Sequence, residues 1–364
     1  MHGVNDALPA LISGLRGVLP REVDWVSLMG LANRNWLTPA LFRALHDASL
    51  IDGVPGDVAD YLLMIHNRNL ERNRRLRDQL WEAVARLNRA GVEPVLLKGG
   101  ADLAVGGDDR LGIRMMSDLD LLVRSGERAA ACRSLSEAGY RPLSAARSDG
   151  HHQYATLGRG RDVGTVEIHH AVKRFGMLYP PGDAAQGRIV ERDGARAVVL
   201  SASVRAVHLV LHDMVKEGDY WRGCIDLRHL HDLWRLTRGD DAPDWDRMLG
   251  MLPAGAARNA LRTQAVTLQR LFGAAVPDEV TRPLLPRAQH WRRMLQTTRP
   301  RAGLPFRLAG EAVWMVRQTG SRCRLMWSDQ ADAVTPLRRV QDKLRSGPGA
   351  AVQALIGTDK GPKL

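Results

Sequence analysis

Cysteine is scarce in this chain of 364 residues. Only Cys132, Cys224 and Cys323 occur, and no two of them form a Cys-x-x-Cys pair. This spacing argues against a disulfide framework and a zinc knuckle, and it favours a reducing, cytoplasmic setting. No apolar run reaches the roughly 20 residues of a membrane-spanning helix. The N-terminus, with Asp6 early, lacks the basic-then-apolar pattern of a secretion signal.

Charge is unevenly distributed along the chain. Hydrophobic residues make up 45% and charged residues 25%, which excludes a disordered chain, and the length fits about two domains. The net charge is +12, yet residues 280–364 alone hold 16 Lys and Arg against 5 Asp and Glu. Two interpretations of this basic quarter stay open. It is either a footprint for an anionic partner or a solvated, Arg-rich helical surface, which is the commoner case.

Apolar periodicity divides the chain into four parts. Residues 1–90 are predicted to be helical, most clearly over 61–90, and residues 91–200 mix strand-like and helix-like segments. Residues 201–280 return to helical spacing, and 281–364 predict a basic, mostly helical region with a frayed tail. The strands expected in the middle part are 94–97, 118–123, 153–157, 163–170, 189–191 and 195–200. This pattern predicts an α+β fold with a compact mixed core between helical regions.

Two carboxylates occupy the expected strand 118–123. Asp118 and Asp120 stand at positions i and i+2, so they project from one face, while the apolar residues between them face a buried side. Neighbouring carboxylates repel each other unless a cation lies between them, and Mg²⁺ prefers such oxygen ligands. Glu167, in the strand-like run 166–169, is the best candidate for a third acid. If Asp118 and Asp120 stood alone, without Glu167 and the neighbouring glycine turn, two solvated carboxylates at a strand end would be the simpler interpretation.

A glycine turn precedes these acids. Lys98-Gly99-Gly100 follows a short apolar run, and such a turn at a helix start presents backbone N–H groups to phosphate. The turn alone is a weak signal, but together with Asp-x-Asp and a later strand acid it becomes specific. Asp102 would repel an incoming triphosphate if it faced it. We expect Asp102 to point away, as a favourable acid in the first turn of a helix.

Together these segments resemble the uncharacterised nucleotidyltransferase family of the polymerase-β superfamily. The resemblance rests on Leu-Leu-Lys-Gly-Gly at 96–100, Arg-Met-Met-Ser-Asp-Leu-Asp-Leu-Leu-Val at 114–123 and Val-Glu-Ile-His at 166–169, with further likeness at 207–209 and 224–227. It spans roughly residues 90–250. It implies a minimal polymerase-β-like nucleotidyltransferase core, a small mixed sheet with helices on one side. It also implies Mg²⁺-dependent transfer of a nucleoside monophosphate from an NTP to an acceptor hydroxyl, with release of pyrophosphate.

The resemblance also implies roles for individual residues. Asp118 and Asp120 would ligate two Mg²⁺ ions, and Glu167 would join them on the catalytic ion and orient or deprotonate the acceptor hydroxyl. Gly99 and Gly100 would contact the triphosphate. For Lys98, Arg114 and Ser117, both a phosphate contact and a structural role stay open.

Other polar residues keep two interpretations each. His169 shares the face of Glu167, so it lines the site or makes a structural hydrogen bond. Arg222 and Asp226 either face the acceptor or nucleobase or serve helix packing. The adjacent histidines 151–152 and 169–170 point to opposite faces of a strand, which argues against a zinc site.

Three functional interpretations follow. The first is a nucleotidyltransferase acting on a small molecule, peptide or protein. The second keeps this chemistry but makes the acceptor an RNA docked on the Arg-rich residues 280–364. The third is a nucleotide-binding accessory protein without turnover. The sequence leaves open which NTP is used and the oligomeric state.

Overall fold

The computed structural model describes residues 4–143, 153–170 and 187–326. His151, His152 and the tail 327–364, with its predicted frayed end, lie outside these residues. None of the helices within the described ranges is long and apolar enough to cross a membrane.

A mixed sheet forms the centre of the fold. Within the described residues its seven strands follow the order β3-β4-β5-β2-β1-β7-β6. Strand β2 runs parallel to β5 and antiparallel to β1, and β1 runs parallel to β7. The outer pairs β3–β4, β4–β5 and β6–β7 are antiparallel. The strands are β1 (Val95–Leu96), β2 (Asp118–Val123), β3 (Arg141–Pro142), β4 (Gln153–Gly158), β5 (Thr165–His170), β6 (Gly187–Arg192) and β7 (Ala195–Leu200).

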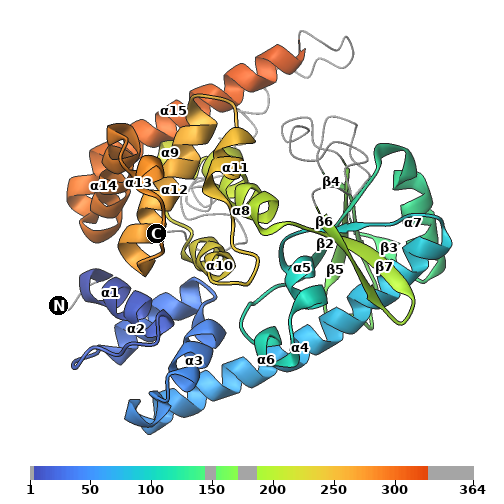
Figure 1. Ribbon diagram of the computed structural model, residues 1–364, viewed down its shortest axis with the longest axis horizontal. Coiled ribbons are helices and arrows are strands. Elements are labelled where there is room, and N and C mark those ends of the chain that lie inside the picture. Colours follow the sequence, from blue (N-terminus) through green and yellow to red (C-terminus); the bar gives the residue numbers. More distant parts are fainter. Residues whose placement is uncertain (1–3, 144–152, 171–186, 327–364) are drawn as a thin grey trace, which may run out of the picture.

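Helices precede, interrupt and follow the sheet (Figure 1). The first group comprises α1 (Val4–Leu15), α2 (Trp25–Arg34), α3 (Thr38–Asp47), the short η1 (Ile51–Gly53) and the long α4 (Gly56–Arg89). Between strands lie α5 (Lys98–Val105), α6 (Asp108–Leu111), η2 (Ser125–Glu127) and α7 (Arg128–Glu137). After the sheet come α8 (Ala202–Val210), η4 (Leu211–Lys216), α9 (Asp219–Arg222), α10 (Leu227–Thr237), α11 (Trp245–Gly250), α12 (Ala256–Phe272), α13 (Asp278–Thr281), α14 (Leu284–Thr298) and α15 (Pro300–Met326). The mixed fold class predicted from the sequence is confirmed.

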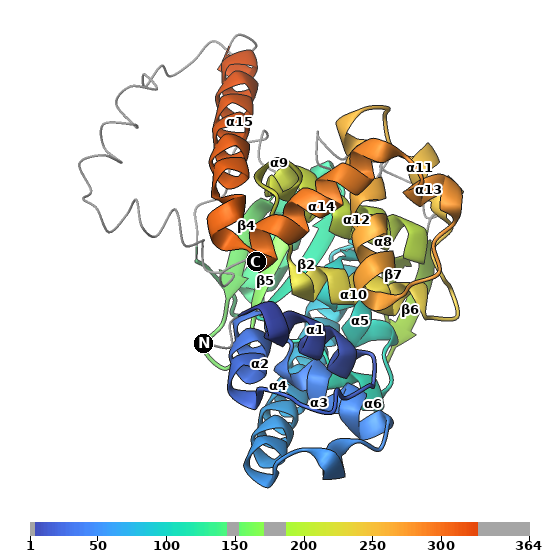
Figure 2. The ribbon, with the colours of Figure 1, turned by 90° about the vertical axis from the view of Figure 1, so that its left-hand side faces the viewer.

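Two apolar cores hold these elements together. One lies between the sheet, α7 and the second half of α4, where Leu76 and Leu80 are fully buried. The other joins α1–α3 to α8, α10 and α12, so helices from both ends of the sequence share one core. The long α4 contributes Leu62 to this second core and therefore spans both. In Figure 2, α15 rises as a long helix beyond this body.

Strand β2 lies where the two cores meet. Leu119, Leu121 and Val123 bury against the α4 side of the sheet. Leu122, on the same face as Asp118 and Asp120, instead belongs to the helical core. One face of β2 carries the acids and the other is apolar, as the sequence predicts, and the helical region covers the face that carries the acids. The acidic residues lie at the junction between sheet and helices.

Candidate active site

Strands β2 and β5 bring the three predicted acids together. The parallel register pairs Asp120 directly with Glu167. Asp118 lies two residues before Asp120 on the same face. Asp120 is only 2% exposed, whereas the Glu167 side chain keeps 21% of its surface open. A buried carboxylate thus stands beside one that solvent or a substrate can reach.

Lys98 neutralises part of this acidic charge. Its Nζ donates a hydrogen bond of 2.6 Å to Asp120 Oδ1. Burial by itself would lower the pKa of Lys98, but the charges of Asp120 and Asp118 outweigh burial and raise it. Lys98 also has a φ of +45°, a left-handed conformation that a non-glycine residue adopts only at a cost. The chain accepts local backbone strain at the residue whose ammonium reaches the acids.

His169 lies on the other side of Asp120. Its Nε2 is 2.8 Å from Asp120 Oδ1 and 3.4 Å from Glu167 Oε2. Burial would lower the pKa of His169, but the hydrogen bonds to Asp120 and Glu167 raise it above its usual value. Conversely, burial would raise the pKa of Asp120, yet Lys98 and His169 hold it well below its usual range. Asp120 therefore stays ionised.

Asp118 shows that the acidic charge is not fully balanced. Burial and the neighbouring charge of Asp120 raise its pKa, and Glu167 adds to this effect. A divalent cation would relieve such repulsion, and carboxylates are the donors that Mg²⁺ prefers. Ligand atoms of Asp120, Glu167 and His169 all lie within 4.8 Å of one another. The carboxylates of Asp120 and Glu167 therefore fit one divalent metal ion, and Asp118 is not part of this group.

The glycine turn forms the first turn of α5, beneath the acids. Gly99 and Gly100 are both buried, and α5 begins at Lys98, so both glycines lie inside the helix. A Cβ on Gly99 would overlap the Arg114 guanidinium and come within 2.7 Å of Met116 Sδ. Gly99 thus has a packing reason to be glycine, besides the predicted contact with a triphosphate.

Asp102 differs from expectation, because it lies beyond the first turn of α5. It forms an ion pair with Arg205 on α8 instead. Arg114, which precedes β2, is 9% exposed and its Nε donates to Asp232 Oδ2 at 2.8 Å. Of the two roles left open for Arg114, this placement favours the structural one. Ser117 is exposed, and its backbone carbonyl accepts a hydrogen bond from Thr165 N.

Arg222 and Asp226 lie in the helical region with partners of their own. Arg222 Nε donates to Glu311 Oε1 at 2.7 Å. Asp226 caps α10 by accepting a hydrogen bond of 3.0 Å from the backbone N–H of His229. These contacts correspond to the helix-packing interpretation of both residues.

Sequence reasoning missed the polar side chains of α4 that hold the loop before β2. Asn69 and Asn73 each donate to the backbone carbonyl of Arg114, at 3.2 and 2.8 Å. Arg72 reaches the carbonyl of Met116 at 3.1 Å. The two asparagines stand at i and i+4, a spacing that places them on one helix face. Such buried amides in a charged helix were the available signal.

Comparisons with known proteins show what this chain is similar to. Residues 21–273, more than half of the chain, match the family described as uncharacterised nucleotidyltransferase. The match extends further in both directions than the 90–250 expected from the motifs. Among solved structures, an antigenic nucleotidyltransferase-like protein from Paracoccidioides brasiliensis is 15% identical, with a TM-score of 0.32. That alignment covers 57% of this chain and 97% of the other.

A second solved structure is the antibiotic-resistance factor ANT(2'')-Ia, at 12% identity and a TM-score of 0.27. This alignment covers 67% of this chain and 96% of the other. No curated protein matches the chain.

Proposed function

This chain belongs to the uncharacterised nucleotidyltransferase family, and we propose that it transfers a nucleoside monophosphate from an NTP to an acceptor hydroxyl, releasing pyrophosphate. The observation that carries the proposal is the group of three carboxylates at the junction of sheet and helices, with Asp120 buried and ionised beside Glu167. We further propose that it works in the cytoplasm, as its three cysteines, none of them in a Cys-x-x-Cys pair, favour.

Asp118, Asp120 and Glu167 would hold two Mg²⁺ ions. When bound, such ions supply charge stabilisation for an in-line displacement at phosphorus. The raised pKa of Asp118 supports this assignment, because it reflects burial together with repulsion from Asp120, and a cation would relieve the repulsion. Lys98 and His169 already balance Asp120, so the remaining acidic charge lies with Asp118 and Glu167.

Individual residues of the chain would then have separate roles in the reaction. The acceptor oxygen forms a bond to the α-phosphorus, and the bond from that phosphorus to the β-phosphate bridging oxygen breaks. Glu167, the more exposed acid, takes the proton of the acceptor hydroxyl. His169, hydrogen-bonded to both acids, orients Glu167 and Asp120. Lys98 and the first turn of α5 would meet the phosphates of the NTP.

The decisive experiment supplies each of the four labelled NTPs, with Mg²⁺, to the protein in a cell lysate and identifies the labelled product. The wild type is expected to label one acceptor class and release pyrophosphate. Asp118→Asn is expected to lower release by about a thousandfold or more, because it removes a metal ligand. Asp60→Asn, an exposed acid on α4, is the matched control and should retain wild-type activity.

Each result bears on the proposal. Transfer that survives in Asp118→Asn would contradict the metal site. Binding of Mg²⁺-NTP by a folded protein that never releases pyrophosphate would favour the accessory protein without turnover. A labelled RNA, lost on deleting the basic region after residue 280, would assign the acceptor to nucleic acid.

A further inference from the structure

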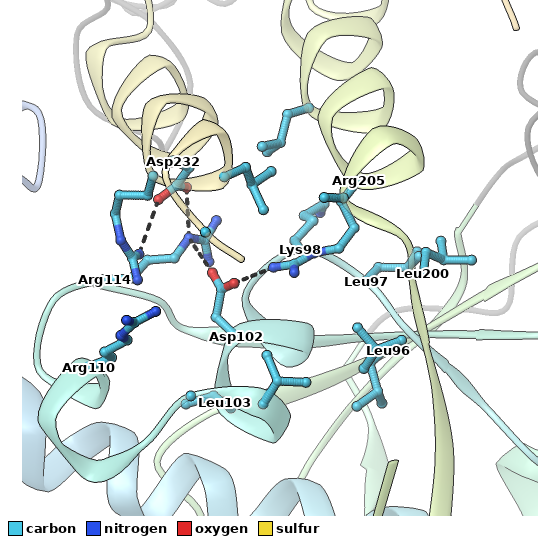
Figure 3. A pocket seen from close by; sticks show the side chains of 18 of the residues that line it. Leu96, Leu97, Lys98, Asp102, Leu103, Arg110, Arg114, Leu200, Arg205 and Asp232 are labelled. Atoms are coloured by element: carbon cyan, nitrogen blue, oxygen red, sulfur yellow. Dashed lines mark hydrogen bonds and ion pairs between the residues drawn. The ribbon is translucent and has the colours of Figure 1, made fainter. Parts of the chain in front are cut away.

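A cavity of about 550 Å³ lies between the sheet and the helical region (Figure 3). Its floor is α5, and its walls come from α8, α10 and the end of β7. This volume falls in the range of about 300–1,000 Å³ that is typical of small-molecule sites. The cavity is therefore built partly by the end of strand β7 in the sheet and partly by α8 and α10 of the helical region.

A chain of ion pairs is built into the cavity wall. Asp102 on α5 pairs with Arg205 and lies 4.0 Å from Arg114 Nε. Asp232 on α10 accepts from Arg114 at 2.8 Å and lies 4.0 Å from Arg235. Figure 3 shows Asp102 between Arg114 and Arg205. Three guanidinium groups thus share two carboxylates, which leaves one positive charge in excess.

The wider lining is also basic in balance. Among the described lining residues, six lysines and arginines face four aspartates. Arg188, on β6, has no ion-pair partner among the described residues, and the Arg235 side chain is 25% exposed. Guanidinium groups fixed by neighbouring carboxylates offer a preorganised fork for the two oxygens of a carboxylate or phosphate.

Lys98 connects this cavity to the acids. It lines the cavity, and its Nζ is 2.6 Å from Asp120 Oδ1. His208, another lining residue, has its pKa lowered to about 3 by burial and by the charge of Lys98, so its imidazole is neutral. Asp118, Asp120 and Glu167 are not among the residues that line the cavity, so a ligand there approaches the proposed active site at its Lys98 end.

We propose that this cavity is the acceptor site and that it takes a small hydroxyl compound with one carboxylate or phosphate group. The inference rests on the proposed function and names its acceptor class. A triphosphate fits this cavity less well, because the carboxylates of Asp102 and Asp232 stand in its wall and repel a polyanion. The phosphates of the NTP would instead lie at the acids and at Gly99 and Gly100, which are not among the residues that line the cavity, and Lys98 would stand between the two ligands. A single anionic group matches the small positive excess and can bind Arg235, while the hydroxyl end lies toward Lys98 and Asp120.

Direct binding tests this assignment without turnover. Glycerate and glycerol 3-phosphate serve as carboxylate and phosphate probes, and glycerol serves as the neutral probe, each titrated by calorimetry without nucleotide. At least one anionic probe should bind, and glycerol should bind at least tenfold more weakly. Arg235→Gln should weaken the anionic probe about tenfold or more, since a charge-assisted hydrogen bond is lost. Arg238→Gln, one turn further on and outside the cavity lining, is the matched control.

Nucleotide binding separates this proposal from the alternatives. The dissociation constant of Mg²⁺-ATP should be the same in Arg235→Gln and wild type. If Arg235→Gln lost affinity for the nucleotide as much as for the probe, the nucleotide would be the ligand of the cavity and the proposal would be overturned. Three further outcomes would also overturn the proposal: anionic probes that bind Arg235→Gln as tightly as wild type, glycerol that binds as tightly as the anionic probes, or no binding of either anionic probe. Failure of the proposed function has a different signature, the absence of pyrophosphate release by a wild type that still binds the anion through Arg235.

Discussion

Two buried groups in this molecule combine histidine with carboxylate, and they differ in the balance between the two. On the sheet, the single imidazole of His169 faces the carboxylates of Asp120 and Glu167. In the helical region, the carboxylate of Asp213 on η4 lies between two imidazoles. Its Oδ1 is 3.0 Å from His212 Nδ1 and 2.7 Å from His229 Nδ1. In each group the ligand atoms lie within 4.8 Å of one another.

In the helical group, both ring nitrogens of each histidine have partners within the protein. The far nitrogen of His212 lies 3.3 Å from Lys216 Nζ, and that of His229 lies 3.1 Å from Arg228 NH2. Two basic side chains thus flank it, together with the carboxylates of Asp226, 3.5 Å from His229 Nδ1, and Glu217, 3.8 Å from His212 Nε2. On the sheet the acids outnumber nearby cations, and the pKa of Asp118 is raised. The same residue types therefore point to a stabilising network in one place and to a cation site in the other.

Replacing Asp213 should have the largest effect on stability. Asp213→Asn weakens two buried, charge-assisted hydrogen bonds, so we expect a loss of about 3 kcal/mol in the free energy of unfolding. Glu167→Gln should stay within about 1 kcal/mol of wild type, because it reduces repulsion between carboxylates. Urea unfolding of both variants measures this.

Activity should rank the same two variants in the opposite order. Folded Asp213→Asn should keep its pyrophosphate release within a few-fold of wild type, and Glu167→Gln should lose about a thousandfold as the proton acceptor disappears. The comparison fails if the Asp213 variant loses activity as severely as the Glu167 variant does.

A smaller effect should appear in the pH dependence of stability. The folded-state pKa of His169 is raised above the ordinary 6.5. Its stabilising contribution is therefore complete below about pH 6.5 and is lost as the pH rises through the folded-state value. The difference in unfolding free energy between wild type and His169→Gln, measured with EDTA, should narrow from pH 6 to pH 9. If the difference in unfolding free energy stayed constant over this pH range, His169 would not gain stabilisation from protonation beside Asp120 and Glu167.

Local rules were enough to predict that two of the candidate acids share one face of a strand. The i, i+2 rule placed Asp118 and Asp120 on one face of the strand 118–123, and that strand has the predicted bounds. The link from Lys98 to Asp120 could not be predicted, because it depends on an unusual φ and on how α5 meets β2. The ion pair of Asp102 with Arg205 joins residues 103 positions apart, which periodicity does not reveal.

The basic C-terminal quarter shows the limit of counting charge. Both interpretations of it placed its arginines on the surface, yet Arg293 on α14 is 1% exposed. It donates to the carbonyl of Cys224 and to the side chains of Gln264 and Thr267. Burial lowers the pKa of Arg293 to about 10. Part of the apparent surface charge therefore holds helices together, and it is unavailable to an RNA.

Binding of Mn²⁺, followed by electron paramagnetic resonance, tests the central claim most directly. Mn²⁺ shares the carboxylate preference of Mg²⁺ and reports its own coordination. Wild type and Asp213→Asn should both bind the ion, and Asp118→Asn should bind it at least tenfold more weakly. Unchanged binding by Asp118→Asn, or loss of binding in Asp213→Asn alone, would contradict the assignment of the metal site to the acids of β2 and β5.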